Sequence, residues 1–512
     1  MALNRGRRSN GFQNSNWLSL SINKKKNKKS MNSRTITLLL SFSVTAVLTA
    51  AAEKAKSPKP NIILVMSDDM GWGELGMMGN KLINTPNIDK FSAESLQFTN
   101  FNVAASCAPT RAQMMSGRHE FSVGVTHTVL KRMNLRDDIT ILPQYMKRGG
   151  YQTAMFGKWH LSEDKTGLTG KSLEPHDRGF DHALWTFNQL KRFDPPLNLN
   201  GKMTKHKGYC ADVLFNEAMK WMEGADPTKP FFTYIPTSIP HNPIAAPQKF
   251  IDLYKNTKLT KKQKGYYAMV SALDANMGRL MKWMDQKTFP RKTILIFMTD
   301  NGHAIGGARG AGHDDDGFLK ESGLYNAGMR GAKGQAWYGS TRVPFFIRWP
   351  GVTKSGEANS LASATDLLPT FAAIAGVKLD DAKITGYNLL PDIMGQKSTV
   401  PGNRLLVSHR GRWPRSDKLD DYKYEYASVY DKQYRLTWGM KGKGPQLIDY
   451  LKDPGGLTDV SVQHPEIVQL YKKHFESWWQ EVKPGMVNDL EQIKTGDILV
   501  FGKRNSKKKK TK

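Results

Sequence analysis

The chain has 512 residues, 39% of them hydrophobic and 12 of them tryptophan, which suits a large domain with a smaller one beside it and excludes a disordered protein. Its formal net charge of +29 would suit a nucleic-acid-binding protein, but 15 of the basic residues lie within 1–30 and 503–512, where there is no acid. Residues 53–502 keep a net charge of +13. We therefore expect solvated basic ends, no nucleic-acid site, and a body that still attracts polyanions.

The N-terminal segment has the pattern of an export signal behind a long basic preface. An apolar stretch over 36–48 follows an arginine and precedes three alanines at 50–52, the small residues typical of a cleavage site. The stretch is too short for a comfortable membrane span, although an uncleaved anchor stays the alternative. We predict a preface over 1–30, which translation from Met31 would make an artefact, and a signal peptide over 31–52. The protein is then exported to the periplasm, the cell surface or the extracellular space, with no stable membrane span.

Four short apolar runs predict the central strands of a parallel sheet. They cover 61–67, 153–156, 231–235 and 293–299, and each is apolar on both faces, as in strands that helices cover on both sides. A helical pattern over 266–285 lies between two of them, and this alternation predicts an α/β sandwich with a large, mixed but mostly parallel sheet. Each run leads into polar or charged residues. Because ligands bind beyond the carboxyl ends of such strands, we expect the functional site there.

From about residue 400 the pattern changes to that of a small antiparallel sheet. Three strand-like runs and one amphipathic helix are expected, over 405–409, 424–430, 434–439 and 465–482. We therefore predict a catalytic domain over 53–400, a small C-terminal α+β subdomain over 401–485 with one helix, and a basic tail over 486–512.

The most specific motif is Cys-Ala-Pro-Thr-Arg at 107–111, followed by Ser-Gly-Arg at 116–118. Proline suits the first turn of a helix, so Cys107 would lie at a helix N-terminus, where backbone N–H groups favour an anion. The one other cysteine is Cys210. A buried structural thiol and a Cys107–Cys210 disulfide therefore stay open as alternatives to a reactive cysteine.

This motif resembles the signature of the sulfatase family, whose cysteine is oxidised to formylglycine during maturation. Further segments resemble family motifs in the same order, at 61–73, 85–89, 157–161, 240–243, 300–302, 330–334 and 342–344. The similarity covers about residue 59 to about residue 485. It implies an alkaline-phosphatase-like fold, hydrolysis of sulfate esters, one calcium ion per chain, and a formylglycine-generating maturation enzyme as a partner.

The resemblance also implies a metal site. Its ligands would be Asp68, Asp69, Asp300 and Asn301, which are oxygen donors at strand ends, together with position 107. A hard divalent cation needs such a set, and Ca²⁺ tolerates irregular geometry better than Mg²⁺. For either pair alone, a loop cap or turn is the alternative. The metal would bind a sulfate oxygen as a Lewis acid.

The catalytic roles follow from the same resemblance. Hydrated formylglycine at Cys107 would attack sulfur with one hydroxyl, and its second hydroxyl would let the hemiacetal collapse and release sulfate. Arg111 would hold the formylglycine or the charge on the metal side, while Lys158 and Lys333 would offset charge around the sulfate. His160 is expected to be the base for the second hydroxyl.

Protonation of the leaving oxygen would fall to His241, alone or with Lys333. Thr110 stands where many members have serine, a change we expect to be tolerated. The Gly-rich segment that follows Asn301 contains His303, which is placed directly beside the metal ligands. The same segment also contains Arg309, His313 and an acidic run at 314–317, which suggest a substrate loop, a second ion site or, preferred for the acidic run, a solvated loop.

Aromatic residues and arginines could line a sugar site, because aromatic faces stack on sugars and arginines pair with sulfates. The candidates are Trp185, Trp337, Tyr338, Arg410 and Trp413. Core packing is an equal or better interpretation of each tryptophan.

The leading functional interpretation is hydrolysis of sulfate esters on a sulfated carbohydrate or polysaccharide, since a basic, exported body fits a polyanionic glycan. The same residues would suit an arylsulfatase acting on small aromatic esters, or a phosphodiesterase or phosphonate monoester hydrolase of the same superfamily. Outside the enzymes, the alternative is a sulfated-glycan-binding protein in which Cys107 is never oxidised. The complete set of metal ligands, lysines and histidines argues against it.

Overall fold

The computed structural model describes residues 58–304, 324–413, 416–439 and 444–490. The predicted preface and signal peptide lie outside these residues, as do Arg309, His313, the acidic run 314–317 and the basic tail from 491 onward. No helix within the described ranges is both long and apolar enough to cross a membrane.

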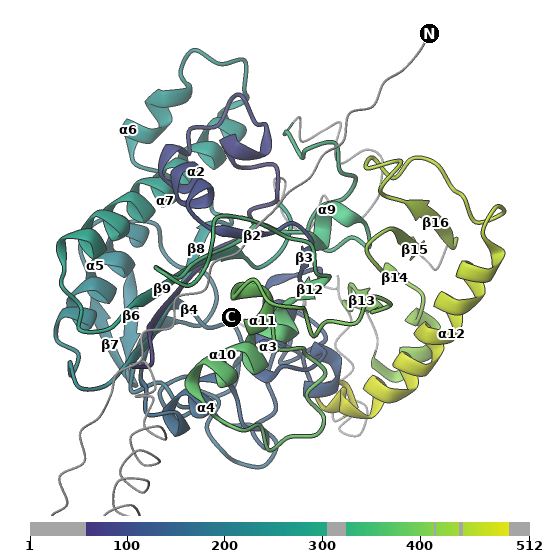
Figure 1. Cartoon of the computed structure of the whole chain (residues 1–512), viewed down its shortest axis with the longest axis horizontal. Helices are drawn as coiled ribbons and strands as arrows, with labels where there is room; N and C mark the ends of the chain where they lie inside the picture. Colours follow the sequence, from purple (N-terminus) through teal and green to yellow (C-terminus); the bar gives the residue numbers. More distant parts are fainter. Residues whose placement is uncertain (1–57, 305–323, 414–415, 440–443, 491–512) are drawn as a thin grey trace, which may run out of the picture. The chain divides into compact units, whose positions relative to one another are not determined.

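A ten-stranded sheet lies at the centre of the main part, with the strand order β11-β2-β10-β9-β1-β8-β4-β5-β6-β7 (Figure 1). The four predicted strands are observed as β1 (Asn61–Asp68), β4 (Gln152–Lys158), β8 (Phe231–Pro240) and β9 (Thr293–Thr299). They are adjacent and parallel in the order β9-β1-β8-β4, which confirms the predicted centre. The remaining strands are β2 (Leu96–Phe98), β5 (His182–Thr186), β6 (Pro196–Leu199), β7 (Lys202–Lys205), β10 (Phe345–Arg348) and β11 (Gly356–Ala358). Antiparallel pairs toward both edges make the sheet mixed.

The alternating side chains of β1 divide the core into two layers. Ile62, Leu64 and Met66 pack into one layer, and Ile63 and Val65 pack into the other, because successive residues of a strand point to opposite faces. The helices of the first layer are α3 (Cys107–Ser116), α4 (Leu142–Arg148) and α10 (Leu367–Ala375). Those of the second are α2 (Pro86–Ala93), α5 (Cys210–Glu223) and α7 (Lys261–Gln286). Figure 1 shows α5 and α7 on one side of the sheet and α3, α4 and α10 on the other, as predicted for an α/β sandwich.

The helix predicted over 266–285 begins earlier, at Lys261, because a capping box precedes it. The Thr260 hydroxyl accepts from the Gln263 N–H, and the Gln263 side chain accepts from the Thr260 N–H. Shorter elements complete this part: η1 (Gly76–Met78), β3 (Phe101–Asn102), η2 (Glu120–Val123), α6 (Gln248–Ile251), η3 (Asp252–Tyr254), α9 (Tyr338–Thr341), β12 (Ala362–Ser363), η5 (Ala364–Asp366) and α11 (Leu390–Ile393).

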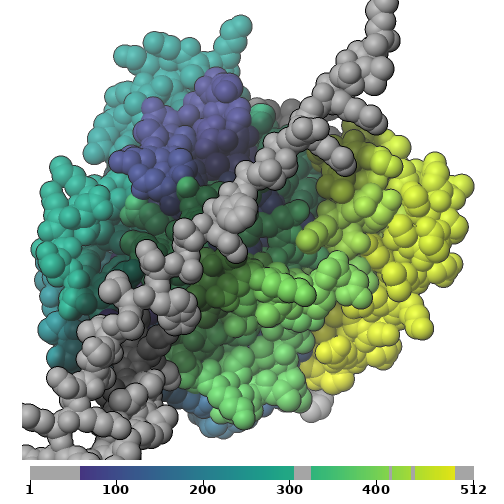
Figure 2. Space-filling model, in the orientation of Figure 1, coloured from purple at the N-terminus to yellow at the C-terminus, as the bar shows by residue number. Residues whose placement is uncertain are grey.

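A separate antiparallel sheet follows, in the order β13-β14-β15-β16. Its elements are β13 (Leu406–His409), β14 (Ala427–Tyr430), β15 (Tyr434–Trp438), β16 (Gln446–Asp449), α12 (Pro465–Val482) and the short turns η6 (Ser416–Tyr422) and η8 (Lys483–Gly485). The predicted small sheet with one helix is confirmed, and the helix has the predicted bounds. Figure 2 shows this C-terminal part, in yellow, packed along the flank of the molecule.

The chain stays in the fold beyond residue 485, where the sequence predicts a basic tail. Asp489 is buried and accepts hydrogen bonds from the Thr126 hydroxyl at 2.6 Å and the Trp413 indole at 2.9 Å. It also pairs with Arg132 at 2.7 Å. One buried carboxylate thus joins the C-terminal residues to loops of the main part.

Candidate active site

The carboxyl ends of β1 and β9 bring four oxygen-bearing side chains together. Asp68 ends β1, Asp69 follows it, and Asp300 and Asn301 follow β9, all at most 1% exposed. Asp69 takes the left-handed conformation, with φ of 67°, which turns the chain out of the strand. Its N–H donates to Asp300 at 3.2 Å, and the Asn301 amide donates to its carboxylate at 2.9 Å. The predicted convergence at this edge of the sheet is therefore observed.

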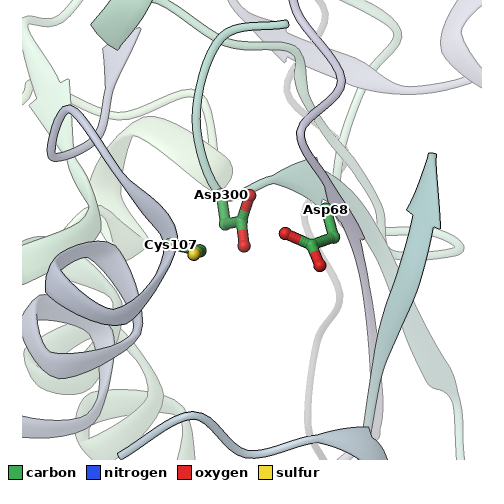
Figure 3. A group of neighbouring side chains, drawn as sticks. All are labelled: Asp68, Cys107 and Asp300. Carbon is green, nitrogen blue, oxygen red and sulfur yellow. The ribbon is translucent and has the colours of Figure 1, made fainter. Parts of the chain in front are cut away.

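Cys107 reaches the same place from the first residue of α3. One ligand atom each from Cys107, Asp68 and Asp300 lies within 4.8 Å of the other two, and Figure 3 shows the three side chains side by side. The alternative of a Cys107–Cys210 disulfide is wrong, because both thiols are free. Cys210 packs in the core layer on the opposite face of the sheet from α3.

Three cations pair with the three carboxylates. Lys158 donates to Asp68 at 2.9 Å and Lys333 donates to Asp69 at 2.6 Å. Arg111 donates to Asp300 at 2.7 Å and to the Lys158 carbonyl at 2.8 Å. The Lys333 ammonium also lies 3.7 Å from the Cys107 sulfur. Every acid of the site thus has a partner of opposite charge, as buried charges require.

These cations make position 107 favourable for an anion. Burial alone would raise the pKa of the Cys107 thiol, but Lys158 and Lys333 together hold it below its usual value. In the same way, burial would raise the pKa of Asp68, and Lys158 and other nearby cations hold it well below its usual range. The site therefore carries an electrostatic field suited to an oxyanion.

The two predicted histidines follow two neighbouring strands of the sheet, β8 and β4. His241 follows β8, with its Nε2 3.5 Å from an Asp69 oxygen. His160 follows β4 with φ of 60°, and its Nε2 lies 3.1 Å from the Thr128 carbonyl. Burial, and then Lys158 and Arg111, lower the pKa of His160 well below its usual value, so this imidazole is neutral at pH 7.

His303, two residues after Asn301, is fully buried and lies beside Glu74. Its Nδ1 lies 3.9 Å from a carboxylate oxygen of Glu74, and neither side chain is accessible to solvent. Burial lowers the pKa of His303 to about 4 and raises the pKa of Glu74 to about 8.

Comparison with known proteins agrees with this geometry. The family model described as Sulfatase matches residues 60–377, more than half of the chain. The chain belongs to the sulfatase family. It is a sulfuric ester hydrolase, and the predicted family, fold class and reaction class are confirmed.

Two relatives and one solved structure illustrate the similarity of this sulfatase to known proteins. Human arylsulfatase A is 30% identical over 83% of this chain and 89% of its own length. An ulvan-active sulfatase from Formosa agariphila is 27% identical over 77% of this chain and 76% of its own length. The crystal structure of Ps i-CgsB in complex with k-i-k-neocarrahexaose matches with a TM-score of 0.71 and 26% identity, over 82% of this chain and 92% of that one.

For the three candidate tryptophans of this sulfatase, burial favours core packing, the equal or better of the two interpretations, over a sugar site. Trp185, Trp337 and Trp413 are 6%, 2% and 1% exposed, so they pack in the core. Tyr338 is half-buried, and Arg410 stacks on Tyr426 with its guanidinium 4.5 Å from the ring centre.

Sequence reasoning missed one cation of the sulfatase site, Arg412. It comes from the loop after β13, and a terminal nitrogen of its guanidinium would lie 3.4 Å from a Cβ placed at Gly334, next to Lys333. Its neighbour Arg410 was a candidate, but only the fold shows which arginine of this loop reaches the site. The glycine between the two was the available signal, because glycine marks a sharp change of chain direction.

Proposed function

We propose that this sulfatase removes sulfate groups from a sulfated carbohydrate, with formylglycine at position 107 as the nucleophile and a bound divalent cation. The observation that carries the proposal is the set of buried cations, Lys158, Lys333 and Arg111, around Cys107 and three carboxylates. The names of an ulvan-active sulfatase and of a complex with neocarrahexaose among its relatives support a glycan as substrate. The signal predicted over 31–52 supports action outside the cytoplasm, where such polymers occur.

The oxygen donors fit a divalent metal. Asp68 and Asn301 each have a buried side-chain oxygen without a hydrogen-bond partner, and Asp69 and Asp300 add further carboxylate oxygens. Hard cations such as Ca²⁺ prefer this all-oxygen chemistry, and position 107 would complete the set once its sulfur is replaced by oxygen. When bound, the ion would act as a Lewis acid toward a sulfate oxygen.

The side chains of this chain would supply the nucleophile, the positive charge around the sulfate and the groups that transfer protons. Formylglycine at position 107, made by a maturation enzyme, would supply a hydroxyl nucleophile and a second hydroxyl for release of sulfate. Lys158 and Lys333 would bind sulfate oxygens and offset charge in the transition state. His160, neutral and with its Nδ1 buried without a partner, would accept a proton, and His241 would donate one to the leaving oxygen.

The test is mass spectrometry of the peptide that contains Cys107, from protein produced with a maturation enzyme, followed by a panel of esters. We expect the mass change for replacement of the thiol by an aldehyde, and turnover of sulfate esters over phosphate diesters and phosphonate monoesters. An unmodified thiol in such a host would favour a glycan-binding role instead. Preference for the phosphorus esters would favour the phosphonate monoester hydrolase alternative.

Replacing Lys333 by methionine is expected to lower kcat about a hundredfold, because this ammonium contacts both Asp69 and position 107 and would face charge that develops in the transition state. Steady-state kinetics check this, with thermal unfolding to confirm that the variant folds despite the unpaired Asp69. The matched control is Lys282→Met on the exposed face of α7. An unchanged kcat in a folded Lys333→Met variant would refute the assigned role.

Replacing His241 by glutamine is expected to lower kcat/KM about a hundredfold for sugar sulfates but less than about tenfold for nitrophenyl sulfate. A sugar alkoxide needs a proton to leave, whereas nitrophenolate is stable without one. The ratio of the two kcat/KM values is the measurement, with His464→Gln on the C-terminal subdomain as control. Equal losses on both esters would show that His241 positions the substrate and is no proton donor.

A further inference from the structure

Arg412 is a cation of the site that no described carboxylate neutralises. The three acids are already paired, Asp68 with Lys158, Asp69 with Lys333 and Asp300 with Arg111. Within residues 58–304, 324–413, 416–439 and 444–490, no side chain forms a hydrogen bond or an ion pair with the Arg412 guanidinium, and its Nε is buried without a partner. Arg412 is partly buried, and a partly desolvated charge without a partner is costly, so this position calls for an anion from outside the described chain.

The loop that carries Arg412 is firmly held. Gly411 and Arg412 both take the left-handed conformation, with φ of 63° and 59°, and a Cβ at Gly411 would lie 1.9 Å from the Thr126 carbonyl oxygen. Trp413 is buried, and its carbonyl accepts from Arg132 at 2.8 Å. A non-glycine residue keeps such a conformation only where its surroundings enforce it. The fold therefore fixes the backbone from which the Arg412 side chain extends.

The Arg412 guanidinium lies beside the turn that follows Lys333. A terminal guanidinium nitrogen lies over the Gly334 turn, 3.4 Å from where a Cβ would be, and the Gly334 N–H donates to the Ala105 carbonyl at 2.7 Å, two residues before Cys107. Burial, and then Arg410, lower the pKa of Arg412 to about 10, while the charges of Cys107 and Asp69 act in the opposite direction. The guanidinium is thus charged at neutral pH, and it interacts electrostatically with Cys107 and with Asp69.

We propose that Arg412 forms a subsite for a second anionic group of the substrate, a carboxylate or a second sulfate ester next to the one that is hydrolysed. The inference rests on the proposed function and deepens it, because it makes the preferred substrate a glycan with two negative groups close together. The planar guanidinium fork matches the oxygens of either group, which a lysine would bind less specifically. Arg412 is then a specificity residue, separate from the cations that hold the scissile sulfate.

The test compares wild type, Arg412→Gln, Arg412→Lys and the control Arg279→Gln, which changes an exposed arginine of α7. Three substrates are used: nitrophenyl sulfate, a sugar with two sulfate esters, and a sulfated sugar with a carboxylate. Arg412→Gln is expected to lower kcat/KM by about ten- to a hundredfold, mainly through KM, on at least one of the two sugars, and less than about threefold on nitrophenyl sulfate. The sugar whose kcat/KM falls more shows whether Arg412 binds a second sulfate or a carboxylate. Arg412→Lys is expected to retain part of the wild-type preference for that sugar over nitrophenyl sulfate.

Two outcomes would overturn the inference. If Arg412→Gln lowered kcat/KM equally on all three substrates, Arg412 would bind the sulfate that is hydrolysed. If kcat/KM fell on none of them, Arg412 would have no role in substrate binding. A wild type that hydrolyses no sulfate ester would instead contradict the proposed function. In that case calorimetry with the two sugars and with inorganic sulfate decides, comparing wild type with Arg412→Gln. Unchanged affinity for both sugars would overturn the subsite as well.

Discussion

Replacing Cys107 by alanine is expected to lower kcat/KM by at least about ten-thousandfold, while the fold persists. The loss is large because alanine cannot be converted to formylglycine, so no group at position 107 can attack sulfur. Stability should fall by no more than about 2 kcal/mol, because the change removes one buried sulfur atom from a helix start that also carries Ala108. Kinetics with nitrophenyl sulfate and thermal unfolding measure the two effects.

Cys210 provides the matched control for this experiment. It is also a free, buried cysteine at the first residue of a helix, but it packs in the core layer on the opposite face of the sheet. Cys210→Ala should therefore change stability to a similar degree and leave kcat/KM within about threefold of wild type. If Cys107→Ala kept most of the activity, the nucleophile would have to be another group, and the proposed mechanism would fail.

The centre of the fold was predictable because its strands are apolar on both faces. Residues 61–67 and 293–299 carry no polar face that a solvent-exposed strand would need, so their place inside a parallel sheet follows from composition alone. Asp68 and Asp300 were predictable for the same reason, since a buried strand ends where charge begins. Convergence of these ends is a property of parallel sheets, and it needed no long-range information.

The C-terminal subdomain shows where such reasoning stops. The strand predicted over 424–430 forms only from Ala427, because Tyr426 takes the left-handed conformation with φ of 52°. Aromatic residues favour strands, and nothing in the sequence marks this one as a turn. Tyr424 instead packs on Phe475 of α12, with ring centres 5.5 Å apart. A tertiary contact thus overrides local preference.

Arg412 and the three buried tryptophans illustrate the same limit at the site. Trp413 and Arg412 are adjacent in sequence, yet Trp413 is buried against Asp489 while Arg412 reaches the loop of Gly334. Which neighbour enters the core and which enters the site depends on the dihedral angles at Gly411 and Arg412, because both are left-handed. Residue type alone does not predict this difference, because tryptophan and arginine are both suited to a sugar site.

Removal of the bound metal is expected to lower kcat about a thousandfold, since a Lewis acid at a sulfate oxygen is worth several kcal/mol in the transition state. The oxygen donors around Asp68 would lose their ion, and Lys158 and Lys333 cannot replace it, because an ammonium group donates hydrogen bonds but cannot coordinate a sulfate oxygen as a Lewis acid. Dialysis against a chelator, followed by titration with Ca²⁺ and separately with Mg²⁺, is the measurement. We expect Ca²⁺ to restore activity at lower concentration.

Thermal unfolding supplies a readout that does not depend on turnover, because a ligand that binds only the folded state raises its stability by mass action. Asp68→Asn should abolish the stabilisation by Ca²⁺. The described residues contain another group that could hold a cation, Glu174, His176 and Asp177 on the surface, so Asp177→Asn is the control and should keep the full response. If the response instead survives in Asp68→Asn and disappears in Asp177→Asn, the ion binds at the surface group. Loss of that ion would then say nothing about catalysis. The oxygen donors at the strand ends, Asp68, Asp69, Asp300 and Asn301, would need another explanation, such as pairing of the carboxylates with the cations of the site.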